Sequence, residues 1–392
     1  MRSILFDFTI YQGEVMFHGG GEYGHAILKK ILELGFGNRL GIFYRCNRPI
    51  NKRLLEECRK KGVKLHPIVE LRNVTGIVYK YGYKTVYSAL LSQEWKDVNL
   101  PLNINFIYTI HGMRLAELAA DGFKAYVEGN ELFFKDRKND ATRAAETYRS
   151  VFIKHREIST IITDSNHSKY SILRYINELQ EDSVFVYYPP LKRSVIIKKN
   201  SLKVLEEIGV QKGAYGLFVS AGIWYKNAIQ GLRAYDCLFD SDYNEIPNEY
   251  RVVVLGTDES ILENIHNKDR FIVKGYVDEE TLEILYKEAH LFLYPSLNEG
   301  FGYPPLEAMK YGTICACSAN TSIPEICGNM VLYFNPLSIE EIVNRIMQSF
   351  NKGLRKKLQE RIKEELPKVQ KRQEKDLLEI VKLICGEKDD EE

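Results

Sequence analysis

The stretch that decides the fold runs from residue 289 to residue 317 and reads AHLFLYPSLNEGFGYPPLEAMKYGTICAC. Its first six residues form a continuous apolar run of strand length, and the run 313–317 at its end has the same character. Between them a glycine-containing turn leads into a short helical pattern. Strand, turn, helix and strand in this order are the repeating unit of an open α/β sheet. Such sheets bind ligands where their strands end.

Two glutamates, Glu299 and Glu307, flank this turn eight residues apart. A turn that exposes backbone N–H groups at the start of a helix is suited to phosphate, and a carboxylate on each side can accept hydrogen bonds from sugar hydroxyls. Phosphate together with sugar hydroxyls indicates a nucleotide-sugar. In the simpler interpretation, Gly300 and Gly302 only allow a tight turn, Glu299 faces water, and Glu307 complements the helix dipole.

Alternating strand and helix patterns extend over the whole chain. Strands that are apolar throughout are typical of parallel sheets covered on both faces. The sequence therefore predicts an α/β protein with two doubly wound parallel-sheet domains. The candidate strands are 3–8, 40–45, 64–69, 75–79, 105–110, 159–163 and 184–188 in the first half, and 215–220, 251–255, 270–273, 289–294, 313–317 and 331–333 in the second.

Prolines mark the expected domain boundaries. The pair Pro189-Pro190 interrupts the pattern and restricts the backbone before it, so we expect a first domain over 1–190 and a second over 191–366. Pro367 lies within a charged helical pattern and is expected to break or kink that helix. The segment 367–392 is predicted to be a last helix with an acidic tail, which we expect to be disordered.

Composition excludes several classes of function. The 392 residues carry a net charge of +1, so the chain lacks the basic field of a nucleic-acid-binding protein. Its seven cysteines are scattered, without a C-x-x-C pair or a spacing typical of zinc sites, and are expected to be reduced thiols. The first residues lack a signal-peptide layout, and no apolar run approaches the roughly 18 to 20 residues that cross a bilayer. We therefore expect a cytoplasmic protein with no nucleic-acid partner.

Positive charge is concentrated locally between Arg45 and Lys64. Eight basic residues lie in this stretch against two acidic ones. A solvated helix face would account for the pattern. The alternative is contact with an anionic partner, either a membrane surface or a diphosphate-linked acceptor, which would place the protein at the inner face of a membrane.

The motifs of the second half resemble one known family. The stretch 271–335 contains Tyr294-Pro295-Ser296, the segment from Glu299 to Glu307 and Ser322-Ile323-Pro324-Glu325-Ile326. It resembles the retaining glycosyltransferases of family 4, whose E-x7-E motif the two glutamates match. The resemblance extends upstream to Lys226-Asn227 and, more weakly, through the first domain. It implies the GT-B fold, in which two Rossmann-like domains face each other across a cleft and the C-terminal helix crosses back to the first domain.

By this resemblance the second domain binds a nucleoside diphosphate-sugar. Glu307 would hold the ribose hydroxyls and Glu299 the hydroxyls of the transferred sugar. Lys226 would neutralise the diphosphate as the sugar departs, and a fixed cation is worth most in that transition state. The base would pack near residues 275–277 and contact their backbone. The other donor-binding residues implied are Asn227, Tyr276, Val277, Gly300, Phe301, Gly302 and Leu306.

The chain departs from the family pattern just before Lys226. Many members carry an arginine five or six residues before the lysine, where this chain has Ser220 and Ala221. The residue directly before the lysine is Tyr225 rather than the frequent arginine. One phosphate-binding cation of the family is therefore absent from its usual position.

The first domain also has features that resemble the family or are expected to act with it. Gly19, Gly20 and Gly21 resemble its glycine-rich loop, since consecutive glycines allow a ligand close to the backbone; a loop without a ligand is the simpler interpretation. His111, at the end of a predicted strand, resembles the histidine that faces the transferred sugar, although such a residue is often only structural. Arg114 would add positive charge on the acceptor side. Ser165 is expected to cap the helix that follows.

The sequence thus predicts a metal-independent, retaining glycosyltransferase that needs no cofactor and takes a glycan or a lipid-linked diphosphate as acceptor. No Asp-x-Asp pair stands at a plausible strand end, and the resemblance suggests assembly of a bacterial surface polysaccharide. Glu299 and His111 would position the substrates rather than attack them. A sugar-nucleotide epimerase or hydrolase, and a catalytically silent partner subunit, remain as alternatives. The donor base, the sugar and the oligomeric state stay open.

Overall fold

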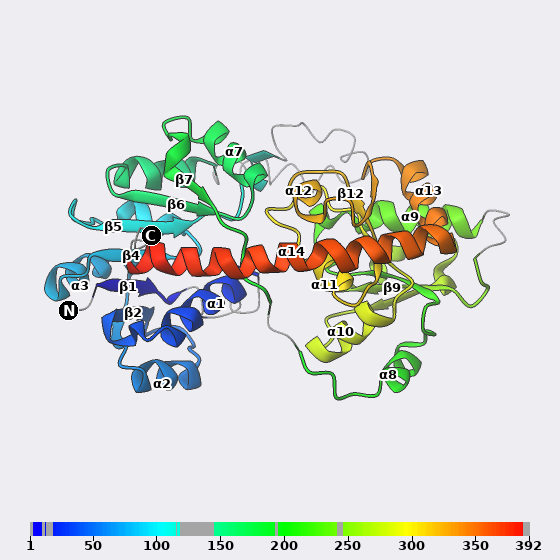
Figure 1. The fold of residues 1–392 in the computed structure, drawn as a ribbon, viewed down its shortest axis with the longest axis horizontal. Helices are drawn as coiled ribbons and strands as arrows, with labels where there is room; N and C mark the ends of the chain where they lie inside the picture. Colours follow the sequence, from blue (N-terminus) through cyan, green and yellow to red (C-terminus); the bar gives the residue numbers. More distant parts are fainter. Residues whose placement is uncertain are drawn as a thin grey trace. The chain divides into compact units, whose positions relative to one another are not determined.

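The computed structural model describes two compact units, each built on one sheet. The first unit comprises residues 1–192 and 371–392, and the second comprises residues 193–370. Figure 1 labels many of their helices and strands. The residues that the structure describes are 3–9, 12, 19–114, 116–117, 145–192, 195–240 and 246–386.

The first unit has a seven-stranded sheet with the order β3-β2-β1-β4-β5-β6-β7, and every pair is parallel. Its strands are β1 (Ile4–Asp7), β2 (Leu40–Arg45), β3 (Lys64–Ile68), β4 (Thr85–Ser88), β5 (Asn105–Thr109), β6 (Ser159–Thr163) and β7 (Val184–Val186). The helices are α1 (Gly19–Glu33), α2 (Lys52–Lys60), α3 (Val74–Tyr81), a helical segment over 145–155 and α7 (Asn166–Tyr175).

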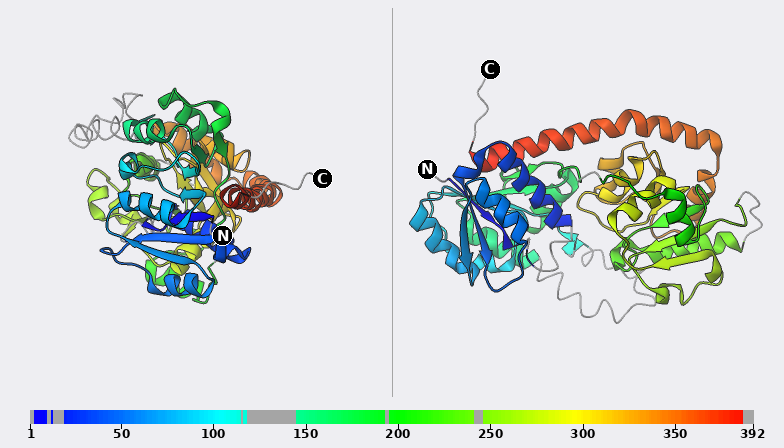
Figure 2. Two further views of the ribbon diagram at one scale, coloured as in Figure 1. Left: turned by 90° about the vertical axis from the view of Figure 1, so that its left-hand side faces the viewer. Right: turned by 90° about the horizontal axis from the view of Figure 1, so that it is seen from below.

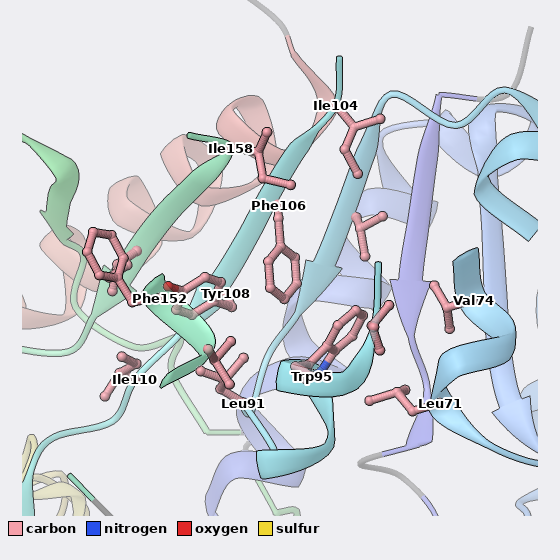
Figure 3. Packing of buried hydrophobic residues seen from close by; sticks show 14 of the residues in the cluster. Leu71, Val74, Leu91, Trp95, Ile104, Phe106, Tyr108, Ile110, Phe152 and Ile158 are labelled. Atoms are coloured by element: carbon pink, nitrogen blue, oxygen red, sulfur yellow. The ribbon is translucent and has the colours of Figure 1, made fainter. Parts of the chain in front are cut away.

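Helices cover both faces of this sheet, because successive strand residues point to opposite sides. In β1, Leu5 packs with α3 and α7 in one buried cluster, part of which Figure 3 shows. Its neighbours Ile4 and Phe6 pack with α1 and α2 in another. Figure 2 shows helices on the two sides of these strands. The apolar strands therefore form the middle layer of three.

The second unit has a six-stranded sheet with the order β10-β9-β8-β11-β12-β13, again parallel throughout. Its strands are β8 (Tyr215–Phe218), β9 (Arg251–Leu255), β10 (Phe271–Lys274), β11 (Leu291–Tyr294), β12 (Ile314–Ser318) and β13 (Leu332–Phe334). The helices are α8 (Ser201–Ile208), α9 (Ala228–Phe239), α10 (Glu279–Glu288), α11 (Tyr303–Met309), α12 (Ile323–Cys327), α13 (Ile339–Ser349) and α14 (Lys352–Cys385).

When the strands are numbered from the start of each unit, both sheets have the order 3-2-1-4-5-6 over their first six strands. This order defines where each sheet can bind a ligand. In each unit the first strand lies between the second and the fourth. The second and third strands are therefore added on one side of the first strand, and the later strands on its other side. Crevices form at the carboxyl ends of the two strands where the direction of winding reverses. These strands are β1 and β4 in the first unit and β8 and β11 in the second. The predicted pair of doubly wound parallel sheets is confirmed.

The predicted strand over 75–79 is wrong, because this segment belongs to helix α3. Its valine, threonine and tyrosine content favours a strand, but Val74 and Val78 lie one helical turn apart and both are buried against the sheet. Gly82 then ends the helix in the left-handed conformation, with φ of 68°. The strand of this region, β4, lies ten residues further on, and all its residues are buried.

Helix α14 continues through Pro367, so the expected break is also wrong, while the alternative of a kink stays a prediction. Proline removes one hydrogen bond, to the carbonyl of residue 363, and both Pro367 and Lys363 are exposed, so water can replace it. Further along, α14 packs with the first unit. Gln373 donates to the carbonyl of Pro189 at 2.7 Å, and Asp376 accepts from the backbone N–H of Tyr188 at 2.8 Å.

The end of α14 completes the core of the first unit. Ile380, Val381 and Ile384 are fully buried with β1, β2 and α1. The acidic tail 387–392, predicted to be disordered, lies outside the described residues. Among the described residues, no helix combines the length and the apolarity that a membrane span needs.

Candidate functional site

Lys226 and Glu299 meet at the switch point of the second sheet. Lys226 ends a short 3-10 helix (Trp224–Lys226) that follows β8, and Glu299 lies in the loop after β11. The Nζ atom of Lys226 lies 2.7 Å from Oε1 of Glu299, and the side chains of Lys226 and Glu299 are only 12% and 7% exposed. The sheet therefore brings a cation and an anion, 73 residues apart in sequence, to the place where such folds bind ligands.

The ammonium group of Lys226 has further partners. It donates to the hydroxyl of Tyr294, the last residue of β11, at 2.8 Å. The ring centres of Tyr225 and Tyr294 lie 5.6 Å and 5.0 Å from Nζ, close enough for cation–π attraction. Thus Tyr225, which stands where the family often has arginine, supplies an aromatic face instead of a second charge.

Glu299 is held on both its side chain and its backbone. Ser296 donates its hydroxyl to Oε1 at 2.5 Å, and the backbone N–H of Glu299 donates to the Thr321 hydroxyl at 3.0 Å. The hydroxyl of Ser322 donates to the carbonyls of Glu299 and Phe301, each at 2.9 Å. These hydroxyls fix the direction in which the carboxylate points.

Asn227 ties the surrounding loops together and is fully buried. It adopts a left-handed backbone conformation, with φ of 59°, which asparagine tolerates better than most residues. Its amide nitrogen donates to the carbonyls of Pro295, at 3.1 Å, and Pro336, at 2.8 Å. Asn227 thus lies beside the predicted donor site but is closed off from solvent, so its position suits support of Lys226 rather than contact with a ligand.

The turn between the two glutamates has fewer backbone donors than a typical helix start. Gly302 precedes α11 with φ of 107°, a conformation open to glycine. The first turn of α11 then contains Pro304 and Pro305, which have no N–H. Gly300, Phe301 and Leu306, all predicted to bind the donor, are buried in this turn. Only some of the backbone groups that were predicted to bind phosphate can therefore donate a hydrogen bond.

Glu307 lies half-buried in the second turn of α11. It accepts a hydrogen bond from the Tyr286 hydroxyl at 3.2 Å. Burial, and then the charge of Glu307, raise the pKa of Tyr286 well above its usual value, so this phenol stays protonated. One carboxylate oxygen thus has a fixed partner inside the protein.

The predicted base-binding segment follows β10. Tyr276 is 85% exposed and Val277 is half-buried. The loops after β8, β9 and β10 are joined at this edge, because Gly256 donates to the carbonyl of Gly275 at 3.1 Å and accepts from the N–H of Gly222 at 3.1 Å. A Cβ atom on Gly222 would lie 2.7 Å from the carbonyl oxygen of Gly256, so the close approach of these loops requires glycine.

His111 lies at the corresponding edge of the first unit, just after β5. Its Nδ1 is 2.8 Å from Oδ2 of Asp164, and its Nε2 is 2.9 Å from the carbonyl oxygen of Ala89. Burial lowers the pKa of His111, but the Asp164 carboxylate and these hydrogen bonds outweigh it, and the net pKa is raised. Since a carbonyl and a carboxylate both accept hydrogen bonds, this geometry favours the doubly protonated form of the imidazole.

The glycines of the first unit open helix α1 rather than precede it. Gly19, Gly20 and Gly21 form its first turn, which corrects the expected loop. The apolar spacing of Tyr23, Ile27 and Ile31 continues the helix, and its first N–H groups have no partner within the helix in any case. Ser165 caps α7 by accepting from the N–H of Ser168 at 3.1 Å, as predicted.

The basic stretch 45–64 divides into a buried and an exposed part. Arg45 is 9% exposed and pairs with Glu94, so it belongs to the fold. Helix α2 turns Leu55 and Cys58 to the core. The exposed basic residues of the stretch are Arg48, Lys52, Arg53, Arg59, Lys60, Lys61 and Lys64.

The residues that support the site were harder to recognise in the sequence. Tyr294, Ser296 and Thr321 have no charge pattern, and their roles depend on which strands are neighbours. Asp164 carries one available signal, a carboxylate directly after an apolar strand. Its pairing with His111 follows from the neighbouring positions of β5 and β6.

Comparison with known proteins gives two similar relatives. "O-antigen chain mannosyltransferase B" of Escherichia coli is 47% identical over 75 residues, which are 19% of this chain and 20% of that protein. "O-antigen chain mannosyltransferase RfbU" of Salmonella typhimurium is 30% identical over 176 residues, which are 45% of this chain and 46% of that protein. The chain thus spans less than half the length of these curated relatives.

Solved structures are similar over almost the whole chain. A glycosyltransferase from Rickettsia africae has a TM-score of 0.65 at 16% identity, with 99% of both chains covered. HepE from Anabaena in complex with UDP and glucose has a TM-score of 0.64 at 14% identity, with 98% of this chain and 99% of that chain covered. At such identities the likeness shows the fold alone, which is the GT-B fold predicted from the sequence. The family model described as glycosyl transferases group 1 matches residues 207–369, which form most of the second unit.

Proposed function

We propose that this protein is a retaining, metal-independent glycosyltransferase that moves a sugar from a nucleoside diphosphate-sugar to a glycan or lipid-linked acceptor. The observation that carries the proposal is the pair of Lys226 and Glu299, 2.7 Å apart at the switch point of the second sheet. A fixed ammonium beside the diphosphate stabilises the charge that develops on the leaving group. The carboxylate can accept hydrogen bonds from sugar hydroxyls.

The proposed roles follow from where each group lies. Glu307 on α11 accepts from the ribose hydroxyls, while the Tyr286 hydroxyl donates to the same carboxylate and orients it. Glu299 positions the sugar, and the acceptor attacks from the face that the diphosphate leaves, which gives retention without a protein nucleophile. The departing phosphate oxygen takes the proton of the acceptor hydroxyl. In the first unit, His111 is proposed to place a positive charge at the carboxyl end of β5.

The relatives suggest which substrates to test first. Both are named as mannosyltransferases that act on O-antigen chains, and HepE was solved with UDP and glucose. We therefore propose a hexose, with mannose first, and an acceptor of bacterial surface polysaccharide assembly. The exposed basic face of α2 would hold a lipid-linked diphosphate or the inner surface of the cytoplasmic membrane.

Ligand screening tests the proposal most directly. Ligands that bind the folded state raise the midpoint of thermal unfolding, so the protein is screened against guanosine, uridine and adenosine diphosphates and their hexose derivatives. We expect one base to give a clear shift that Glu307→Ala reduces. Absence of a shift with every compound would refute the donor site.

Product analysis separates the alternatives. A transferase consumes the donor only when acceptor is present, whereas an epimerase or a hydrolase converts it without acceptor. Proton NMR of the product linkage tests retention, and activity in excess chelator tests metal independence. A silent partner subunit would bind the nucleotide without turnover, and Lys226→Ala would then leave cellular glycan unchanged.

A further inference from the structure

Lys226 and Glu299 are paired with each other in the candidate site. Both side chains are nearly enclosed, and the ammonium also contacts the neutral Tyr294 hydroxyl and two aromatic rings. Charges in such an environment are little screened by solvent. The cation proposed to bind phosphate is therefore already occupied by a carboxylate.

A bound diphosphate has to compete with that carboxylate. A phosphate oxygen that accepts a hydrogen bond from Nζ lies about 3 Å from it. Since Oε1 of Glu299 is 2.7 Å from the same Nζ atom, the phosphate oxygen and the carboxylate oxygen are at most about 6 Å apart. Like charges at this distance repel. Moving Glu299 away would separate a buried carboxylate from its counter-ion, which is costly even though Ser296 also donates to it.

The sugar of a complete donor changes this balance. Its hydroxyls can donate to Glu299 and take the place of Lys226, which is then available to the diphosphate. A nucleoside diphosphate without the sugar offers no such donors. The two ligands therefore differ in how well they satisfy Glu299, although they share the nucleotide.

We propose that Glu299 acts as a competing counter-ion, which weakens the binding of the nucleoside diphosphate left after transfer and so promotes its release. The inference rests on the proposed function, because it assigns a further role to one residue of the same site. Glu299 would favour the sugar-bearing donor over the product, and the return of its contact with Lys226 would accompany product release.

The test compares Glu299→Gln with the wild-type protein. Glutamine has the same shape and keeps an oxygen that can accept from Ser296, but it carries no charge. We expect the dissociation constant of the nucleoside diphosphate, measured by calorimetry, to fall roughly tenfold or more. The preference for nucleoside diphosphate-sugar over nucleoside diphosphate should fall by at least the same factor, and stopped-flow release of the diphosphate should slow.

Glu288→Gln is the matched control. Glu288 is also buried and paired with a lysine, Lys212, at 3.0 Å in the same unit. Glu288 ends α10 and lies near the amino end of β11, whereas Glu299 follows the carboxyl end of that strand. Its replacement should leave the nucleotide affinities unchanged. Glu299→Ala serves as a second charge-removing variant if the glutamine variant does not fold.

The outcomes separate this inference from the proposed function. If the wild-type protein binds the diphosphate and both Glu299 variants bind it equally or more weakly, the counter-ion role is overturned while the donor site stands. If neither the wild-type protein nor any variant binds a nucleotide, the proposed function fails and the inference with it. Tighter binding in Glu288→Gln as well would assign the effect to net charge and also overturn the inference.

Discussion

The side-chain amide of Asn227 donates a hydrogen bond to the carbonyl oxygen of Pro336, 2.8 Å away and 109 residues later in the sequence. A second hydrogen bond joins the same amide to Pro295. The loops that follow β8, β11 and β13 are thus held by one buried side chain, directly next to Lys226. The geometry of the candidate site depends on a residue that solvent does not reach.

Asn227 can be tested by two replacements that differ in backbone freedom. Glycine keeps the left-handed conformation but leaves two buried carbonyls without their donor, which we expect to cost about 1–3 kcal/mol of unfolding free energy. Alanine loses the same hydrogen bonds and adds about 1–2 kcal/mol of backbone strain. Urea unfolding should therefore rank wild type above Asn227→Gly and Asn227→Ala last. Equal stability of all three would show that the amide does not hold the loops.

Removing the charge of Lys226 should affect both stability and activity. Lys226→Met leaves Glu299 buried without its counter-ion, and breaking a buried pair in this way costs about 3–5 kcal/mol. If the proposed function holds, loss of a charge that stabilises the transition state should also lower kcat by about 100- to 1000-fold. Adding Glu299→Gln to this variant should restore much of the stability but not the activity, as measured by urea unfolding and initial rates.

Glu307 should bind the ribose hydroxyls of the nucleotide. Glu307→Ala removes the carboxylate that is proposed to accept from the ribose hydroxyls, and hydrogen bonds to a charged group contribute about 1.5–3 kcal/mol. Calorimetry should show weaker binding of the ribonucleoside diphosphate and almost no change for its 2′,3′-dideoxy analogue, which lacks these hydroxyls. An equal loss for both nucleotides would contradict this role.

His111 should make the stability of the protein depend on pH. Its pKa is raised in the folded state, so the protonated form favours folding. This contribution is complete below the unfolded pKa of about 6.5 and is lost as the pH rises through the higher folded value. Charged groups that act on the ring are Asp164, which favours protonation, and Arg114, which opposes it.

Asp164→Asn tests the origin of this effect. Without the carboxylate, burial dominates and the pKa of His111 should fall. The difference in unfolding free energy between about pH 5.5 and about pH 9 should then shrink relative to wild type, and an NMR titration of the ring should show the lower pKa directly. A His111 pKa that is the same in both proteins would contradict the prediction.

Helix α2 should determine any attraction to anionic lipid. Charge reversal of Lys52, Arg53, Arg59 and Lys60, all exposed, should reduce binding to vesicles that contain phosphatidylglycerol, by about 1 kcal/mol for each residue at the surface. Reversal of Lys356 and Lys357, exposed on α14, is the matched control. Binding that both variants keep would assign the contact to another surface.

The sequence placed the groups of the candidate site more readily than the contacts between them. Lys226 and Glu299 could be located because each follows an apolar strand within a recognisable motif. That they touch depends on the order of the strands, which sets β8 beside β11. Local patterns carry little information on such pairings, and for the same reason the partnership of His111 with Asp164 was not predicted.

Helix α3 shows a second limit, the competition between local preference and burial. The β-branched and aromatic residues around Thr75 favour a strand, yet the segment is a helix because Val74 and Val78 together fill one side of the core. The stop signal at Gly82 was present in the sequence and indicates a helix end once it is weighed with that spacing. The prediction for Pro367 erred in the opposite direction, since it gave one residue more weight than the buried residues along α14.

The assignment of residues 371–392 to the first unit has a consequence for the order of events during synthesis. The buried side chains of Ile380, Val381, Ile384 and Cys385 complete a core whose other buried members lie before residue 193. A ribosome therefore releases the whole second unit before the first can close its hydrophobic face. The nascent first unit must persist with exposed apolar surface during that interval, when domains are most exposed to aggregation and chaperone capture.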